Sequence, residues 1–265
     1  MDDAQFKALL EHLGYCWAGY RKVRKGIKKR IHRHMQRMGC RDIVAYLNLL
    51  EHQAASRYEC ELLMTVSISR FFRDRHLWQM LENRWLPDII AKNRLQIGAW
   101  SAGCACGEEV YSFKIVWQRL KTRFESLPPL QVLATDRHPQ YIERARSGIY
   151  NRSSLREVAA VVRTGFFESR KGSKLFEIKA ELKGDIHWET GHLLTESPGS
   201  VFHIIFLRNN ILTYCRQEDQ IRALESILNC LAPGGLFITG CHETLPVETG
   251  VLIPMAECRY VYKKK

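Results

Sequence analysis

The sequence contains no Cys-x-x-Cys pair, although nine of its 265 residues are cysteines. The cysteines are odd in number and scattered along the chain, which argues against a disulfide framework and against a zinc ribbon. We therefore expect no metal site, and we expect most of the cysteines to be small buried residues.

Long hydrophobic runs are also missing. No stretch approaches the length of a membrane span, and the acidic opening MDDAQF lacks the basic and apolar regions of a signal peptide. These absences predict a cytoplasmic protein without membrane insertion. The content of 46% hydrophobic and 26% charged residues is ordinary for a globular chain, and the length allows one large domain with a smaller companion. We expect it to be a monomer.

The stretch from Leu95 to Tyr111 lacks the usual phosphate-binding signatures. Its pattern predicts a strand, a turn with Gly103 and Gly107, and a helix, but no Gly-Lys-Ser/Thr ending follows. Glu108 and Glu109 come directly after the turn, and two carboxylates there would repel a pyrophosphate and favour a cation. S-adenosylmethionine, with its sulfonium and ammonium groups, carries that charge. The alternative is that the turn only connects a strand to a helix.

Two later strands end in polar residues. The apolar run Leu130 to Thr135 is followed by Asp136, at the place where βαβ units hold ribose hydroxyls. Val201 to Leu207 is almost continuously apolar, as in a central parallel strand, and ends in Arg208, Asn209 and Asn210. Open α/β sheets bind their ligands at such strand ends.

The segment Arg21 to Arg37 has nine Lys or Arg and no acidic residue. Apolar residues recur in it every three or four positions, which predicts an amphipathic helix with a basic polar face. This face is either an ordinary solvated surface or a docking surface for an acidic partner. An acidic protein, nucleic acid and an anionic membrane all qualify, but the segment has no aromatic residues, which makes nucleic acid less favoured.

The chain divides into a helical part and an α/β part. Apolar stripes at helical spacing predict an all-α domain over residues 1–80, and residues 81–265 alternate strands and helices. Short alternating runs at about 165–190, including Asp185 to Trp188, predict a small antiparallel β subdomain inserted there. Pro233 to Gly235 is expected to form a turn before a strand at Leu236 to Thr239.

Several motifs together resemble the CheR-type chemotaxis methyltransferases, which methylate glutamates on chemoreceptors. In order they are FFRD, WSAGCACGEEVYS, ATD, GIY, LRN and LAPGGLFITGCHE, and they cover nearly the whole chain. The resemblance implies a Rossmann-like S-adenosylmethionine methyltransferase domain with a mostly parallel seven-stranded sheet. It also implies that an acidic, chemoreceptor-like protein docks on the basic helix 21–37, and that the β subdomain helps to hold it.

The resemblance further assigns site residues. The cofactor would contact Ser67, Ser69, Arg73, Gly103, Glu109, Asp136, His192, Leu193, Leu207 and Arg208. Arg73 would also hold the substrate carboxylate, with a hydroxyl at Tyr214 or Thr213 fixing its nucleophilic oxygen. A glutamate substrate needs no general base, since its carboxylate, with a pKa of about 4.3, is already ionised at neutral pH.

Three departures from the family pattern stand out. His192 precedes Leu193 where the family has Asn or Asp, so an imidazole would have to recognise adenine. The family tyrosine position is occupied by Thr213, with Tyr214 one residue later. The family's Gly-His-Ser-Glu is GCHE here, with Cys241 second. A methyltransferase acting on RNA or a small metabolite, and a non-catalytic cofactor-binding module, therefore remain alternatives.

Overall fold

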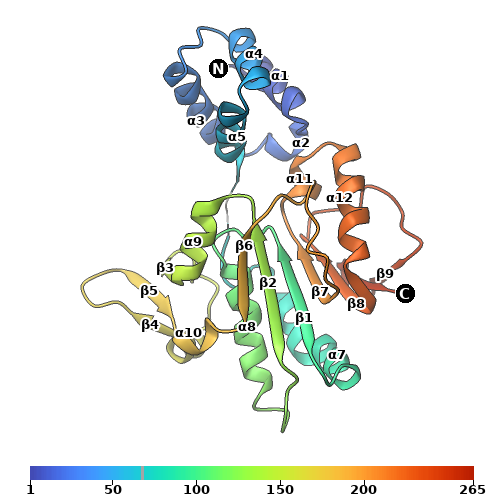
Figure 1. The fold of residues 1–265 in the computed structure, drawn as a ribbon. Helices are drawn as coiled ribbons and strands as arrows, with labels where there is room; N and C mark the ends of the chain where they lie inside the picture. Colours follow the sequence, from blue (N-terminus) through green and yellow to red (C-terminus); the bar gives the residue numbers. More distant parts are fainter. Residues whose placement is uncertain (67–68) are drawn as a thin grey trace.

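A seven-stranded sheet forms the centre of the larger part of the chain (Figure 1). The structure is a computed structural model that describes residues 1–66 and 69–265. The strands lie in the order β6 (Ile186–Thr190), β2 (Leu130–Asp136), β1 (Ile97–Ala102), β7 (Phe202–Leu207), β8 (Leu231–Thr239), β10 (Cys258–Lys264) and β9 (Leu252–Met255). The first five are parallel, and β10 runs antiparallel to both its neighbours. The predicted Rossmann-like, mostly parallel sheet is confirmed.

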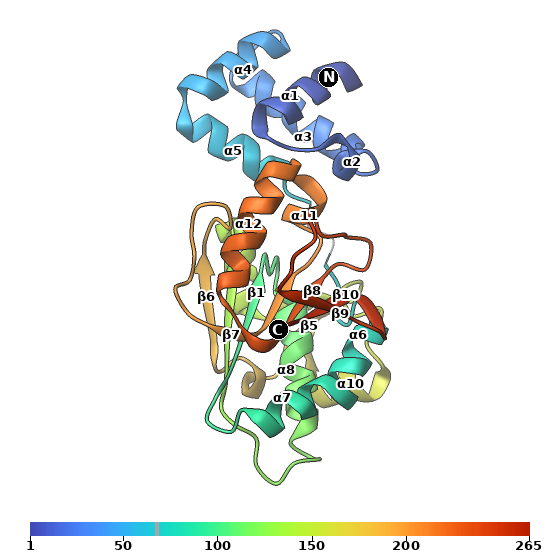
Figure 2. The same cartoon turned by 90° about the vertical axis from the view of Figure 1, so that its right-hand side faces the viewer.

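Helices cover both faces of this sheet because its strands are apolar on both sides. On β1, Ile97 and Ala99 belong to one buried cluster, which α8 (Glu108–Leu120) covers, whereas Trp100 and Ala102 belong to a second. The second cluster packs under α12 (Gln217–Asn229). Figure 2 shows α8 and α12 on opposite faces. Other helices of this part include α6 (Arg75–Met80), η1 (Leu81–Trp85), α7 (Leu86–Lys92) and α9 (Pro139–Ser147).

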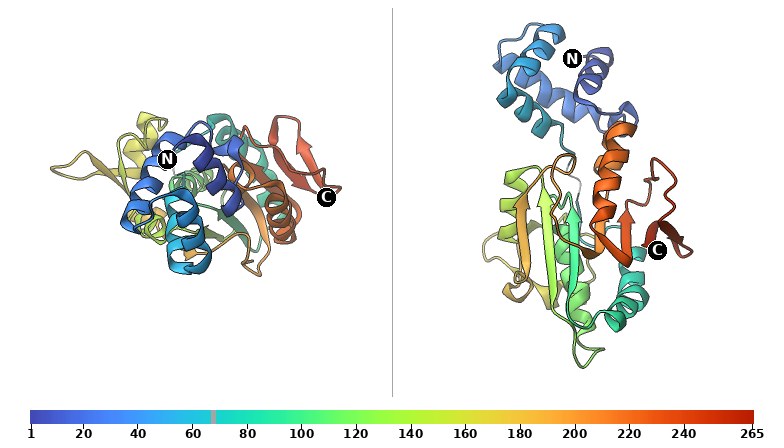
Figure 3. Two further views of the ribbon diagram at one scale, coloured as in Figure 1. Left: turned by 90° about the horizontal axis from the view of Figure 1, so that it is seen from above. Right: turned by 45° about the vertical axis from the view of Figure 1, so that its right-hand side comes forward.

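The N-terminal part is a helical domain with a hydrophobic core of its own. It contains α1 (Asp3–Leu13), α2 (Trp17–Tyr20), α3 (Arg24–Arg37), α4 (Ile43–His52) and α5 (Ala54–Met64). The predicted basic helix exists and begins at Arg24, three residues later than expected. The domain sits above the carboxyl ends of β1, β2 and β7, as the right-hand view of Figure 3 shows. The helical domain therefore faces the edge of the sheet at which the sequence predicts a ligand.

The small antiparallel sheet differs in membership from the prediction. Its order is β3 (Ile149–Asn151), β5 (Leu175–Ile178) and β4 (Phe167–Ser169), the last preceded by α10 (Ala160–Phe166). Asp185 to Trp188 does not belong to it, because Ile186 onward forms β6, which pairs in parallel with β2 after the short η2 (Ala180–Leu182). A short alternating run shows that a strand forms but not which strand it pairs with.

Pro233 to Gly235 do not form the separate turn that the sequence predicts. These three residues lie inside β8, which runs from Leu231 with an irregular register beside β7, so the predicted turn is wrong.

Within residues 1–66 and 69–265, no helix combines the length and the apolar character that crossing a bilayer requires.

Candidate active site

Hollows in the surface lie where the helical domain meets the carboxyl edge of the sheet. Each hollow is named here after one of its lining residues. The His192 hollow has a volume of about 810 Å³, including space open to solvent, and is lined by residues of the helical domain and of the part that contains the sheet. The Glu109 hollow beside it has a volume of about 660 Å³. The two share Thr65, Val66, Gly103, Asp136, Asn209 and Asn210. An adjoining Arg70 hollow is lined by Arg70, Arg73, Asp74, Arg75 and Glu157.

The glycine turn brings backbone directly to the first two hollows. Gly103 has a φ of 88°, and its N–H donates to the Thr135 carbonyl at 2.8 Å. A Cβ there would clash with the Asn210 amide nitrogen and lie 3.2 Å from its Cγ. Only glycine therefore combines this backbone conformation with this close approach. The turn ends at Gly107, and α8 begins at Glu108.

Asp136 lies at the tip of β2 and lines both hollows. Its carboxylate accepts backbone N–H groups from Ala105 at 2.8 Å and His138 at 2.9 Å. Burial raises the pKa of Asp136, and these two bonds oppose the rise only in part. Its position suits the acceptor of ribose hydroxyls that the sequence predicts.

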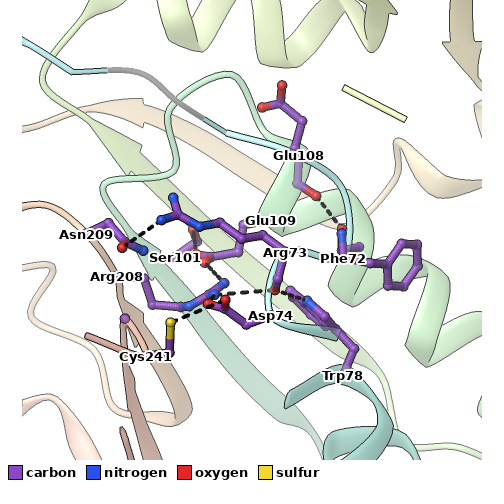
Figure 4. A network of polar contacts seen from close by, with 12 residues as sticks. Phe72, Arg73, Asp74, Trp78, Ser101, Glu108, Glu109, Arg208, Asn209 and Cys241 are labelled. Carbon is purple, nitrogen blue, oxygen red and sulfur yellow. Dashed lines mark hydrogen bonds and ion pairs between the residues drawn. The ribbon is translucent and has the colours of Figure 1, made fainter. Parts of the chain in front are cut away.

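Glu109 belongs to a buried polar network (Figure 4). It accepts a hydrogen bond from Ser101 at 2.7 Å and pairs with Arg208 at 2.9 Å. Arg208 also pairs with Asp74 at 2.5 Å, while its Nε has no partner among the described residues. Desolvation lowers the pKa of Arg208, but the charges of Glu109 and Asp74 raise it by more, so the pKa lies above its ordinary value. The guanidinium therefore stays charged.

Glu108 does not act as the second cofactor-facing acid that the sequence suggests. It is buried, and its Oε1 accepts from Ser154 at 3.1 Å. Figure 4 shows its carboxylate pointing away from Arg208. Adjacent residues on a helix project about 100° apart, so Glu108 and Glu109 cannot both face the turn.

Arg73 sits in a constrained loop. Its neighbours Phe72 and Asp74 have φ values of 54° and 61°, which residues other than glycine rarely adopt. The loop is held because the Phe72 N–H donates to Ser112 at 2.9 Å and Trp78 Nε1 donates to the Arg73 carbonyl at 2.8 Å. The guanidinium donates to Asn209 at 3.1 Å and lines the Glu109 and Arg70 hollows.

His192 and Leu193 line the His192 hollow, together with Arg137. The Leu194 N–H donates to His192 Nδ1 at 3.3 Å, so the ring proton lies on Nε2. Burial lowers the pKa of His192, with the charge of Arg137 as a second cause, so the ring is neutral at neutral pH. A neutral imidazole with its proton on Nε2 can donate to a purine ring nitrogen.

The structure separates the two candidate hydroxyls. Both lie on α11 (Ile211–Tyr214), but Thr213 donates to Glu243 at 2.5 Å. Tyr214 instead lines the His192 hollow. Burial raises the pKa of Tyr214, while the charge of Arg73 opposes the rise. Of the two, Tyr214 is better placed to reach a ligand.

Three further residues are predicted to contact the cofactor, namely Ser69, Leu207 and Ser67. Ser69 lines the Glu109 hollow. The Leu207 side chain is fully buried in the second core, so only its backbone could reach a ligand. Ser67 lies outside the described residues. Sequence reasoning missed Tyr15 and Arg137, which line the His192 hollow; Arg137 directly follows Asp136, but Tyr15 carries no signal in the sequence.

Residues 67–261 match the family model described as CheR methyltransferase, SAM binding domain. The chain belongs to the CheR methyltransferase family. The predicted family is thereby confirmed, the cofactor is S-adenosylmethionine, and the family's class of reaction is methyl transfer.

Several curated proteins are similar to most of the chain. A chemotaxis protein methyltransferase of Listeria innocua is 33% identical over 71% of this chain and 70% of its own length. Chemotaxis protein methyltransferase 1 of Pseudomonas aeruginosa is 27% identical over 83% and 81%. A 104.1 kDa protein from the hypE 3′ region of Rhodobacter capsulatus is 28% identical over 83% of this chain, which spans only 23% of that protein. The solved glycopeptide N-methyltransferase MtfA aligns at a TM-score of 0.37, too low to bear on the site.

The residues that line the His192 and Glu109 hollows include donors and acceptors suited to S-adenosylmethionine. Gly103 lines both hollows, Asp136 can accept ribose hydroxyls, and His192 Nε2–H can meet the adenine. Glu109 lies where the sequence places the charged methionine end. The individual contacts stay predictions.

Proposed function

We propose that the protein methylates glutamate carboxylates of an acidic, chemoreceptor-like helical protein. One observation carries this proposal: Arg70 and Arg73 line a hollow that adjoins the Glu109 hollow. Two guanidinium groups at this place suit a substrate carboxylate, since arginine binds carboxylates with paired hydrogen bonds. When bound, S-adenosylmethionine supplies a methyl group on a positively charged sulfur.

The carboxylates around the hollows also favour an acceptor that is already ionised. Glu61 is bonded to Arg57 and Arg137, Glu109 to Ser101 and Arg208, and Asp136 to two backbone N–H groups. In the Arg70 hollow, Asp74 pairs with Arg208 and Glu157 with Arg70. Among the described residues, each lining carboxylate is thus engaged by a donor of the protein. A glutamate acceptor requires no proton removal, unlike a neutral hydroxyl or an ammonium group.

In this proposal the protein mainly aligns the acceptor. Arg73, fixed by Asn209, would hold the carboxylate, and Tyr214 would orient the attacking oxygen by a hydrogen bond from its hydroxyl. S-adenosylmethionine would supply the methyl group and keep the electrons of the sulfur–carbon bond, so the carboxylate held by Arg73 and Tyr214 would need to lose no proton. Alignment of this kind can contribute about 7–11 kcal/mol.

Helix α3 offers a docking surface for the acidic partner. Part of its basic face is used internally, because Arg24 and Lys28 pair with Asp3 and Arg37 pairs with Glu59. Within residues 21–37, the exposed Lys and Arg without an ion pair to the described residues are Arg21, Lys22, Lys25, Lys29, Arg30 and Arg33. Arg30 donates to the Thr65 carbonyl at 3.0 Å, and Thr65 lines both hollows. The basic face therefore extends to the rim of the candidate site.

The direct test is transfer of a labelled methyl group from S-adenosylmethionine to a helical chemoreceptor fragment, followed by alkaline release of the ester. Calorimetry with S-adenosylhomocysteine measures cofactor binding separately. We expect alkali-labile label on glutamates and none on a fragment whose methylation-region glutamates are replaced by alanine. Cofactor binding without label on acidic helical proteins, combined with labelling of mixed RNA or a metabolite, would contradict the proposal.

A further inference from the structure

The helical domain is joined to α11 by main-chain hydrogen bonds. The Cys16 N–H donates to the Tyr214 carbonyl at 2.8 Å, and the Arg216 N–H donates to the Gly14 carbonyl at 3.0 Å. Tyr15 and Cys215 thereby form an isolated antiparallel bridge. The backbone of Tyr214 is thus tied to the start of α2 as well as to the end of β7.

Gly19 brings α2 into close contact with α11. A Cβ on Gly19 would clash with the Thr213 carbonyl oxygen, lie 2.9 Å from the Thr213 carbonyl carbon, and lie 3.1 Å from the Tyr214 ring. The same Thr213 carbonyl accepts the Cys16 thiol at 3.3 Å. The two helices are in contact through bare backbone at this point, and any side chain larger than hydrogen would push them apart.

Tyr20 supports the ring of Tyr214 from the side of the helical domain. The two ring centroids are 4.9 Å apart with an interplanar angle of 55°. Tyr20 is 3% exposed, and its hydroxyl donates to the Met64 carbonyl at 3.3 Å, so its own ring is fixed. The ring centroids of Tyr20 and Tyr15 are 5.5 Å apart. Tyr214 therefore lines the His192 hollow with its ring packed against Tyr20, which lines the same hollow.

Helix α11 has only four residues, which is too short to hold a side chain by itself. We propose that α2, through Gly19 and Tyr20, positions Tyr214 for methyl transfer. This proposal rests on the proposed function for the reaction, but the placement of Tyr214 by α2 can be measured without it. Gly19 and Tyr20 are positioning residues that act through Tyr214.

The test compares four variants of the full chain. Gly19→Ala creates the clash, and Tyr20→Leu removes the ring while keeping an apolar residue. Tyr20→Phe keeps the ring and loses only the hydroxyl. Gly26→Ala in α3 is the matched control, because a Cβ at Gly26 has no atom within 4 Å. Thermal unfolding identifies variants that fold as the parent does.

The expected result is a loss of kcat with cofactor binding retained. A displacement near 1 Å at a catalytic group can cost about 100-fold, so we expect kcat to fall by about 10-fold or more in Gly19→Ala and Tyr20→Leu. Tyr20→Phe, which keeps the ring but loses the bond to Met64, should lose less kcat than Tyr20→Leu, and Gly26→Ala should keep the parental kcat. Affinity for S-adenosylhomocysteine should change less than kcat in each variant. Parental kcat in folded Gly19→Ala, or equal losses of kcat and cofactor affinity, would overturn the proposal.

A second measurement does not depend on turnover. In protein labelled with 3-fluorotyrosine, the ¹⁹F resonance of Tyr214 is assigned by its disappearance in Tyr214→Phe. We expect this resonance to shift in Gly19→Ala and Tyr20→Leu and to stay in place in Gly26→Ala. An unshifted resonance in folded Gly19→Ala would overturn the positioning role, whereas a parent protein inactive on acidic substrates would contradict only the proposed function.

Discussion

Arg208 Nη1 and Glu109 Oε2 lie 2.9 Å apart in an ion pair that joins the end of β7 to the first turn of α8. The two side chains are 4% and 15% exposed, so water screens the pair only weakly. Asp74 from the Arg73 loop completes the group. One guanidinium thus holds together three of the segments around the Glu109 hollow.

Replacing Arg208 should destabilise the fold strongly. In Arg208→Met two half-buried carboxylates, Glu109 and Asp74, lose the buried cation that they share, and breaking a buried pair typically costs about 3–5 kcal/mol. Urea unfolding measures the free energy. Arg119→Met is the control, because Arg119 pairs with Glu82 at 3.0 Å while 45% exposed and should cost less than about 1 kcal/mol. Similar small losses in both variants would refute the role assigned to Arg208.

Gly103→Ala should weaken cofactor binding. Its φ of 88° is strained for alanine, and the new methyl group would displace Asn210. A strain of about 1–3 kcal/mol corresponds to about a 5- to 150-fold loss of affinity for S-adenosylhomocysteine if binding must restore the native turn. Calorimetry on Gly165→Ala, where a Cβ meets no atom within 4 Å, is the comparison. Unchanged affinity in Gly103→Ala would exclude backbone approach at this turn.

Cofactor affinity should fall at acidic pH because of Asp136. Its anion is the form that accepts ribose hydroxyls, and burial raises its pKa above the ordinary value of about 3.9. The anion is present above this raised pKa and is lost as pH falls through it, so binding weakens at a higher pH than an ordinary aspartate would dictate. Calorimetric titrations at a series of pH values measure the profile. Asp136→Asn should bind the cofactor more weakly at neutral pH, and its affinity should depend less on pH. A pH profile identical to that of the parent protein would argue against Asp136 as the group that accepts the ribose hydroxyls.

Arg73→Lys should impair methyl transfer more than cofactor binding. Lysine keeps the charge but loses the planar fork that binds a carboxylate with two hydrogen bonds. We expect kcat to fall about 10- to 100-fold, since a hydrogen bond to a charged group contributes about 1.5–3 kcal/mol. Steady-state kinetics on the receptor fragment is the assay, and the exposed Arg94→Lys serves as the control. Parental kcat in Arg73→Lys would remove Arg73 from the reaction.

Neutralising the exposed face of α3 should raise KM for the acidic protein. The variant Lys25→Ala/Lys29→Ala/Arg33→Ala removes three exposed cations without touching the hollows. We expect KM to rise and its dependence on salt to weaken, because exposed charges act over about 10 Å at 0.1 M salt. The control removes Lys92, Arg94 and Lys121, which are exposed elsewhere on the chain. Equal changes in both variants would mean that only net charge matters.

Several features of the fold could be predicted because they depend on neighbouring residues. The strand, glycine turn and helix around Gly103 follow from local periodicity and from glycine's backbone freedom. The apolar run of β7 reveals a strand covered on both faces. By contrast, Ile186–Thr190 forms a strand as expected but pairs with β2, since pairing depends on residues far away in the chain.

The sequence by itself determined the class of fold, the family and the residue types at the strand ends, since each is encoded in local pattern. The tertiary structure decided which side chains meet. It turned Glu108 away from Glu109, placed Tyr214 rather than Thr213 at the hollow, and brought Tyr15 of the helical domain beside Arg137. The reason is that helix rotation and domain contact follow from packing between distant segments, which a local pattern does not contain.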